Sequence, residues 1–127
     1  MLNQSGITSV KGMTKKSIVI DNKLMFATSC MIADTGVLAG GDGKKIVKAG
    51  TPLKGDLTNR ATALKVATAA EDAVVGIAEF DVDVTNGNAN GACIVFGFID
   101  ESKLDSDVVE KITTVTKAKL PLITFIK

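Results

Sequence analysis

Three polar residues at two-residue spacing, Asp81, Asp83 and Thr85, are the first candidates for chemistry in this 127-residue chain. Alternate carboxylates at this spacing begin the loops that hold Ca²⁺ with oxygen ligands. Such a loop needs glycine at its sixth position and glutamate at its twelfth, where this chain has Asn86 and Ala92. We therefore interpret the carboxylates as the solvent face of a strand, with structural ion binding as the alternative.

The pair Gly43-Lys44 is a second candidate, because a phosphate-binding P-loop ends in Gly-Lys followed by serine or threonine. The motif also needs a glycine five residues before the second glycine. Leu38 and Lys45 occupy these two positions, so the segment is interpreted as a solvated turn.

Two further absences limit the chemistry that this chain can perform. It has no histidine, which removes the commonest general base and a common zinc ligand. Cys30 and Cys93 lie among apolar residues and form no Cys-x-x-Cys pair, so we expect two buried reduced thiols. A Cys30–Cys93 disulfide and a reactive thiol are the alternatives. The chain is expected not to be an enzyme and to use no cofactor or metal.

The charge balance gives no sign of a charged partner. The chain has 15 basic and 14 acidic residues and a net charge of +1, so no broad field favours nucleic acid or an anionic membrane. It has no run of 18 apolar residues and no signal-peptide pattern at its start. We expect a protein that is cytosolic at synthesis and has neither nucleic acid nor membrane as a partner.

The strongest local pattern, which must position the carboxylates, lies in residues 74–100. Apolar and polar residues alternate from 78 to 85, which predicts a strand with one buried face. An Asn- and Gly-rich stretch, 86–90, follows, and residues 93–99 then form an apolar run that predicts a more fully buried strand. The two strands are expected to form a hairpin. Asn86, Asn88 and Asn90 are interpreted as its turn, with a polar recognition patch as the alternative.

The rest of the chain predicts short strands and one helix. Strands are expected at residues 17–20, 25–33, 44–47 and 122–126, and a loop with one or two helical turns at 57–70. An amphipathic helix is expected, with Ser106 or Asp107 as its N-cap and with Val108, Ile112 and Val115 on its buried face. It is expected to end before Pro121. The predicted fold class is mostly β with one C-terminal amphipathic α-helix, in a single domain covering residues 17–127.

Residues 1–16 show no sustained periodicity and are predicted to form a flexible N-terminal arm. An extended arm of this kind can also add a strand to the edge of a partner's sheet. The residues that would do this are Gly6, Ile7, Thr8, Ser9, Val10 and Lys11.

Five segments of the chain form a recognisable set of motifs. They are Asp-Ala-Val-Val-Gly-Ile at 72–77, Phe-Asp-Val-Asp-Val-Thr at 80–85, the loop at 86–91, Gly-Phe-Ile-Asp at 97–100 and Gly-Thr-Pro-Leu at 50–53. With these motifs the sequence resembles head-decoration and head-fibre proteins of tailed bacteriophages. The resemblance covers about residues 11–127 and rests on structural motifs without a catalytic signature.

The resemblance implies a β-tulip fold of the lambda-decoration type and assembly as a homotrimer on the capsid surface. It implies the major capsid protein as partner, with the N-terminal arm ordering against the shell. The leading hypothesis is a capsid decoration protein that stabilises the assembled head, found on the virion and in the host cytoplasm during assembly. The alternative is a head-fibre or adhesion module that binds a host receptor or carbohydrate through the asparagine-rich loop.

Overall fold

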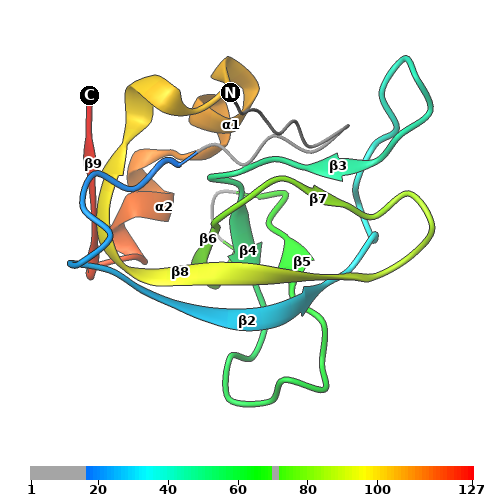
Figure 1. Cartoon of the computed structure of the whole chain (residues 1–127), viewed down its shortest axis with the longest axis horizontal. Coiled ribbons are helices and arrows are strands. Elements are labelled where there is room, and N and C mark those ends of the chain that lie inside the picture. The colour runs from blue at the N-terminus through cyan, green and yellow to red at the C-terminus, as the bar shows by residue number, and fades with distance from the viewer. Residues whose placement is uncertain (1–16, 70–71) are drawn as a thin grey trace, which may run out of the picture.

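Short strands of the chain join into one large and one small sheet (Figure 1). The computed structural model describes residues 17–69 and 72–127, and the predicted N-terminal arm lies outside them. The large sheet has the order β2-β8-β6-β4-β5, with β9 also paired to β8, and the small sheet pairs β3 with β7. The mostly β fold class is confirmed. The strands are β2 (Phe26–Ile32), β3 (Ile46–Val47), β4 (Pro52–Lys54), β5 (Lys65–Val66), β6 (Val74–Ala78), β7 (Val82–Asp83), β8 (Ala89–Asp100) and β9 (Ile123–Ile126).

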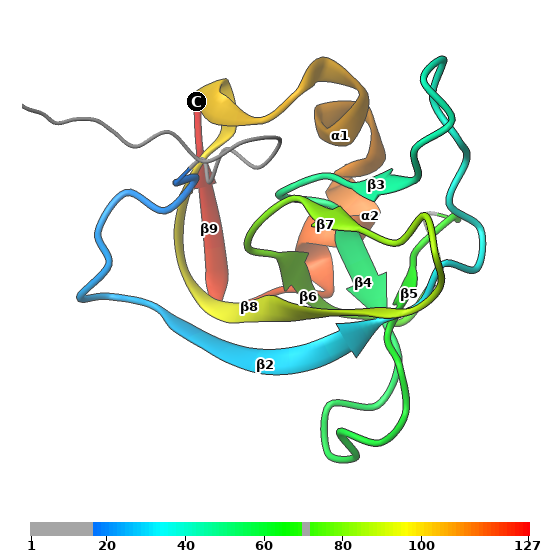
Figure 2. The same ribbon diagram turned by 45° about the vertical axis from the view of Figure 1, so that its right-hand side comes forward.

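Strand β8, with twelve residues, is the element on which the fold is built. It pairs with β2 and β6 in antiparallel fashion and with β9 in parallel, and Figure 2 shows it curving upward beside β9. Successive side chains of a strand point to opposite faces, and Cys93 and Ile94 accordingly enter two different cores. The first core contains Ile77, Ile94 and Ile99 together with the helices. The second contains residues of β2 and of the small sheet.

The predicted hairpin is correct in part. Strands β6 and β8 do pair, with Ile77 opposite Ile94, but the alternating stretch 78–85 is not one strand. The chain leaves the large sheet after Ala78, and β7 pairs with β3 instead of with β8. The Asp81 carboxylate accepts a hydrogen bond of 2.8 Å from the backbone N–H of Ala49. This bond ties the bend between β6 and β7 to the segment that follows β3.

The predicted C-terminal helical segment is present but interrupted. It forms α1 (Ser106–Lys111) and α2 (Thr114–Ala118), preceded by the 3₁₀ turn η1 (Glu101–Lys103). The hydroxyl oxygen of Thr113 accepts a hydrogen bond of 3.1 Å from the backbone N–H of Thr116, so Thr113 caps a new helix. Val108 and Ile112 are buried in the first core, as the amphipathic pattern predicts.

Two other expectations for secondary structure are correct only in part. The loop expected at 57–70 is present and has hydrogen-bonded turns at Asp56–Asn59 and Asn59–Thr62, but its described residues form no helix. The side chains of Asp56 and Asn59 accept hydrogen bonds from the backbone N–H groups two residues further along the chain, as in turns, and β5 follows. The strand expected at 17–20 is reduced to a single bridge between Val19 and Ile99.

The connection from β5 to β6 is closed by Asp72. Its Oδ2 accepts hydrogen bonds from the backbone N–H groups of Thr68, at 2.9 Å, and Ala69, at 3.0 Å. The ammonium group of Lys54 lies 3.1 Å from the same oxygen. These contacts, the bond from Ala69 first, hold the pKa of Asp72 below its usual value of 3.8.

One ion pair joins η1 to α2. The Glu101 side chain is 6% exposed, and its Oε2 lies 2.9 Å from Nζ of Lys117, whose side chain is 39% exposed. That oxygen accepts no hydrogen bond of good geometry from the described residues. The charge of Glu101 is therefore offset inside the protein mainly by Lys117, which also lies over the ring of Phe125 at 5.4 Å.

Candidate interaction surface

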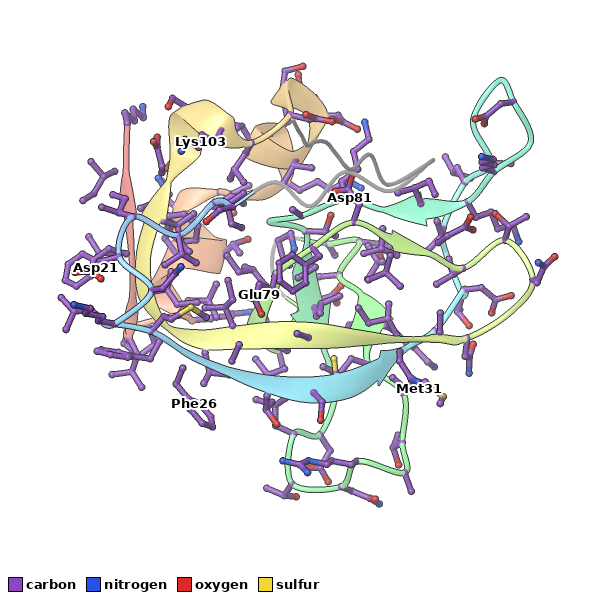
Figure 3. All side chains as sticks on the ribbon, viewed as in Figure 1. Asp21, Phe26, Met31, Glu79, Asp81 and Lys103 are labelled. Carbon is purple, nitrogen blue, oxygen red and sulfur yellow. The ribbon has the colours of Figure 1, made fainter. Side chains whose placement is uncertain are left out.

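Three phenylalanines lie exposed on the outer side of the sheet, where β2 begins and β8 ends. Phe26 is 58% exposed, Phe96 40% and Phe98 37%. Phe26 and Phe96 are directly opposite each other on neighbouring strands. Figure 3 shows Phe26 projecting from the outer side of β2. The chain has five phenylalanines in all, and three of them are exposed at this one place.

A β-bulge explains why these rings point outward. Phe26 pairs with Phe96, but Ala27 pairs with Ile94, so Val95 is an extra residue on β8. Ile94 therefore enters the first core, while Phe96, beyond the bulge, faces the opposite side. Two residues further along, Phe98 shares that outer face.

Four aliphatic side chains extend the exposed aromatic group on both sides of β8. Ile20 and Leu24 lie on the β2 side, where the backbone N–H of Ile20 donates to the carbonyl of Phe98 at 2.9 Å. On the β9 side, the carbonyl of Leu122 accepts from the N–H of Gly97 at 3.1 Å, and Ile126 is paired with Asp100. We call this surface the aromatic face; its members are Ile20, Leu24, Phe26, Phe96, Phe98, Leu122 and Ile126.

The outer edge of β2 adjoins the aromatic face. Near the end of the strand, Leu64 covers this edge, since its N–H donates to the carbonyl of Met31 and its carbonyl accepts from the N–H of Ala33, both at 2.8 Å. The backbone groups of Ala27 and Ser29 point to the same edge by alternation. The carbonyl of Ser29 accepts a hydrogen bond of 3.4 Å from the hydroxyl of Thr28, and no backbone group from outside the strands bonds to either residue in the described part of the chain. The guanidinium of Arg60 donates to Oγ1 of Thr28 at 3.1 Å, so one charged group lies beside this edge. Between that group and Leu64 the edge has no proline, and such an edge is open to strand addition.

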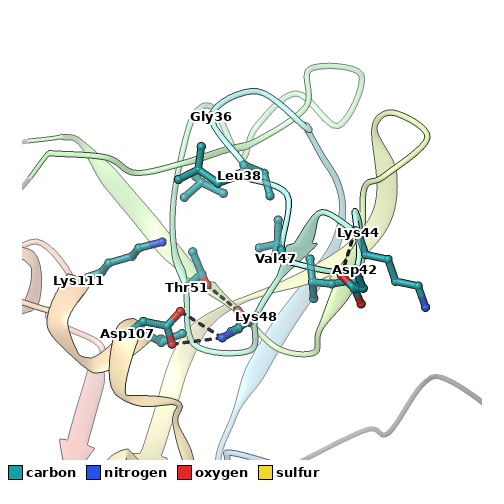
Figure 4. A pocket seen from close by; sticks show the side chains of 14 residues that line it. Gly36, Leu38, Asp42, Lys44, Val47, Lys48, Thr51, Asp107 and Lys111 are labelled. Atoms are coloured by element: carbon teal, nitrogen blue, oxygen red, sulfur yellow. Dashed lines mark hydrogen bonds and ion pairs between the residues drawn. The ribbon is translucent and has the colours of Figure 1, made fainter.

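A cleft of about 450 Å³ lies between α1 and the loop that precedes β3 (Figure 4). Its most prominent charged group is the ammonium of Lys48, which lies 3.1 Å from Oδ2 of Asp107 and 3.2 Å from Oδ2 of Asp105. Hydrogen bonds to Asp107 and then to Asp105 raise the pKa of Lys48. The amine is thereby kept protonated, so it serves as a structural cation and not as a base or nucleophile. The remaining lining is mixed, with Leu38, Ile46, Val66 and Val108 beside Asp42, Lys44 and Lys111.

Asp81 and Asp83, the carboxylates on which the metal-site hypothesis rests, accept hydrogen bonds from different partners. Asp81 binds the N–H of Ala49. Asp83 accepts a hydrogen bond of 2.9 Å from the N–H of Thr85 and another from its hydroxyl, and these bonds, the hydroxyl first, lower the pKa of Asp83. No cluster of three metal-ligating side chains is found within residues 17–69 and 72–127.

The remaining candidate residues, Asn88 and the two cysteines, have structural roles. Asn88 accepts a hydrogen bond of 3.2 Å from the N–H of Asp34, which ties the turn before β8 to the end of β2. Cys93 is buried and Cys30 half-buried, and both are free thiols, so the disulfide alternative is wrong in this structure. Burial first, and the neighbouring Cys30 second, raise the pKa of Cys93 to about 12.

The structure describes the aromatic face but not the predicted capsid-binding residues. Gly6, Ile7, Thr8, Ser9, Val10 and Lys11 lie outside the described residues. The aromatic face was missed by sequence reasoning, which expected residues 93–99 to be buried; this is wrong for Phe96 and Phe98. The available signal was the placement of two phenylalanines on either side of Gly97, which puts both rings on one face of a strand.

No protein family model matches the chain, and no curated protein matches it at a significant level. In the described part of the chain, no helix has the length and apolar character that crossing a membrane requires.

Proposed function

We propose that this protein is a structural decoration protein that binds the outer surface of an assembled phage head and stabilises it. The observation that carries the proposal is the aromatic face, because a contiguous exposed apolar patch marks a surface for contact with other protein. The resemblance of residues 72–100 to head-decoration proteins supplies the class of partner, the major capsid protein.

Stabilisation follows from linkage. A protein that binds only the assembled, expanded lattice lowers the free energy of that state relative to all others. Several linked copies strengthen attachment, because the second contact becomes intramolecular once the first is made. A homotrimer, as the resemblance implies, would use this effect. No cofactor, nucleic acid or membrane is needed for such a function, and the protein would act on the virion after synthesis in the host cytoplasm.

The proposed attachment is strand addition by residues Gly6 to Lys11. In this mode the main chain of the arm forms hydrogen bonds with a sheet edge of the capsid protein. Proline lacks the N–H that such pairing requires. Replacing Ile7 and Val10 by proline therefore tests the attachment while keeping the full chain.

The measurement is co-sedimentation of purified protein with expanded and with unexpanded heads. We expect the wild type to sediment with expanded heads, the Ile7→Pro/Val10→Pro variant to remain in the supernatant, and a Gln4→Pro control to bind normally. Equal binding by the double-proline variant would contradict the role of the arm. A wild type that binds neither form of head would contradict the proposed function.

A second candidate is the adhesion module, which the three exposed phenylalanine rings favour, since aromatic rings pack on the apolar faces of sugars. Its sequence-based version placed recognition in the loop at 86–90, whereas the exposed rings lie at Phe26, Phe96 and Phe98. Adsorption of the isolated protein to host cells, without binding to heads, would establish this candidate in place of the first.

A further inference from the structure

We propose that the outer edge of β2 is a docking site for an extended segment of another protein that carries a carboxylate, which Arg60 binds. The site is separate from the head attachment proposed above, where this chain supplies a strand through residues 6–11; at β2 it receives one. The evidence is the row of unpaired backbone groups on β2, the hollow beside them and the unused donors of Arg60.

The edge offers a short row of backbone hydrogen-bonding groups. The N–H and C=O groups of Ala27 and Ser29 point outward, and so does the N–H of Met31. Leu64 ends the row, because its N–H donates to the carbonyl of Met31. The carbonyl of Ser29 keeps a second lone pair beside its 3.4 Å bond from the Thr28 hydroxyl. An incoming strand therefore finds about four backbone hydrogen bonds here.

A hollow of about 370 Å³ lies where this edge meets the loop between β4 and β5. Figures 1 and 2 show that loop projecting beyond β2. Met31 is 38% exposed and lies near the end of β2 in Figure 3. The hollow thus leaves room for side chains of an incoming strand, and Met31 offers one of them an apolar contact. The lining residues are Ser29, Cys30, Met31, Arg60 and Asn90.

Arg60 supplies the charge that selects the incoming segment. Its Nη2 donates to Oγ1 of Thr28 at 3.1 Å, and the described part of the chain contains no ion pair of Arg60. The carboxylate of Asp56, in the same loop, accepts instead from the N–H of Thr58 at 2.9 Å. A guanidinium has five N–H donors, and two of them together bind a carboxylate. Arg60 is therefore a cation held at the edge with donors to spare.

The bond to Thr28 fixes where the carboxylate belongs. Residues directly opposite each other on neighbouring antiparallel strands have Cβ atoms about 5 Å apart on the same face. An acidic residue opposite Thr28 consequently projects beside the guanidinium of Arg60. A charge at a sheet edge ordinarily blocks strand addition. Against an acidic strand the same charge is attractive, so it selects that strand over neutral and basic ones.

The charge of Arg60 disfavours the two strands that this chain itself could offer. Residues 1–16 contain three lysines and no acidic residue. Strand β2 of a second copy has no acidic residue either, and pairing two β2 edges brings two Arg60 side chains to the same strip. Like charges that face each other across strands are destabilising. The occupant favoured by the charge is an acidic segment of a different protein.

The probe is the end-blocked peptide Thr-Val-Thr-Glu-Thr-Val-Thr, titrated into isotope-labelled full-length protein and followed by amide chemical shifts. We expect saturable shifts at Ala27, Ser29 and Met31. The same peptide with Gln in place of Glu should bind about fivefold more weakly. Arg60→Gln should abolish this preference, and Arg60→Glu should prefer a peptide with Lys in that place. Lys103→Gln removes an exposed charge elsewhere and, as the matched control, should keep the wild-type preference.

N-methylated peptides test the main-chain contact without altering the protein. Methylation of the two threonines beside Glu removes the N–H groups that face the edge and should abolish binding, whereas methylation of the Glu nitrogen, which faces away, should not. Absence of shifts at Ala27 and Ser29 with millimolar peptide overturns the inference, and so does equal binding of the Glu and Gln peptides. Tighter binding of the Gln peptide to Arg60→Gln than to the wild type also overturns it, because Arg60 would then only guard the edge.

Hydrogen exchange of the free protein decides between the proposed occupant and this chain's own strands. We expect fast exchange at Ala27 and Ser29 without peptide and slow exchange with it. Slow exchange that Ile7→Pro/Val10→Pro makes fast would place the chain's own arm at the edge and overturn the inference. Protection that grows with protein concentration would overturn it in favour of a second copy. No heads are used, so failure of this inference and failure of the proposed function are distinguishable.

Discussion

Among the glycines of ordinary φ in the described part of the chain, Gly76 is expected to destabilise the fold most when it is replaced by alanine. Gly76 lies in β6, where its partner on β4 is Leu53. A Cβ atom at this position would lie 2.5 Å from the backbone carbonyl oxygen of Ile94 and closer still to the sulfur of Cys93. Ordinary contacts of a Cβ atom are 3.4–4 Å, so β6 and β8 would have to separate by about an ångström at the centre of the sheet.

Two opposing contributions set the loss of unfolding free energy in Gly76→Ala. Overpacking a core costs typically about 1–3 kcal/mol, and this position belongs at the upper end because the obstacle is backbone and cannot rotate away. Alanine also restricts the unfolded chain, which stabilises by about 0.4–1 kcal/mol. We expect a net loss of about 2–3 kcal/mol, which corresponds to roughly 8–12 °C in Tm for a chain of this size.

The assay is urea unfolding followed by circular dichroism. Gly41→Ala is the matched control, because a Cβ atom at Gly41 meets no atom within 4 Å and only the unfolded-state term remains. We expect the control to equal or slightly exceed the wild type in stability, with an unchanged m-value in both variants. A Gly76→Ala protein within about 0.5 kcal/mol of the control would refute the packing of β6 against β8 described above.

Three further predictions concern charges and thiols. Lys117→Met leaves the buried carboxylate of Glu101 without its partner and should cost about 1–3 kcal/mol, given that Lys117 is partly solvated; adding Glu101→Gln should recover much of this loss in a double-mutant cycle. At about pH 8, a thiol reagent should modify Cys30 slowly and leave Cys93 unmodified in the native protein, whereas both should react in guanidinium; rapid reaction of Cys93 would contradict its burial. The pKa of Asp72 in the folded protein lies below its usual 3.8, so its contribution to stability is complete above that value and is lost as the pH falls through the folded pKa. The urea midpoint of the wild type should therefore decrease when the pH is lowered below about 4, and Asp72→Asn should reduce that decrease.

Several features of the fold follow from local sequence. Alternation between apolar and polar residues correctly identifies Val82 and Val84 as buried, because the period of two is a property of the extended backbone. The apolar stripe through Val108 and Ile112 correctly places the helical segment against the core. What it does not show is the break at Thr113, where a side-chain hydroxyl competes with the continuing helix for a backbone N–H.

Pairing between strands is less accessible to local reasoning. Adjacent strands in sequence were expected to pair, yet β7 pairs with β3 because Asp81 holds the bend between β6 and β7 against Ala49. No pattern within residues 78–100 carries that information, since the decisive hydrogen bond joins positions 32 residues apart.

The sequence by itself determined that this protein is mostly β, that residues 93–99 form an apolar strand, and that the chain has no histidine for acid–base chemistry. Only the tertiary structure decided which of the two faces is covered. Both faces of β8 carry apolar side chains, so hydrophobicity does not distinguish Ile99 in the core from Phe98 in solvent. The bulge at Val95 and the separate routes of β3, β7 and the helices make that distinction, because burial depends on what packs against a strand as well as on the strand's own residues.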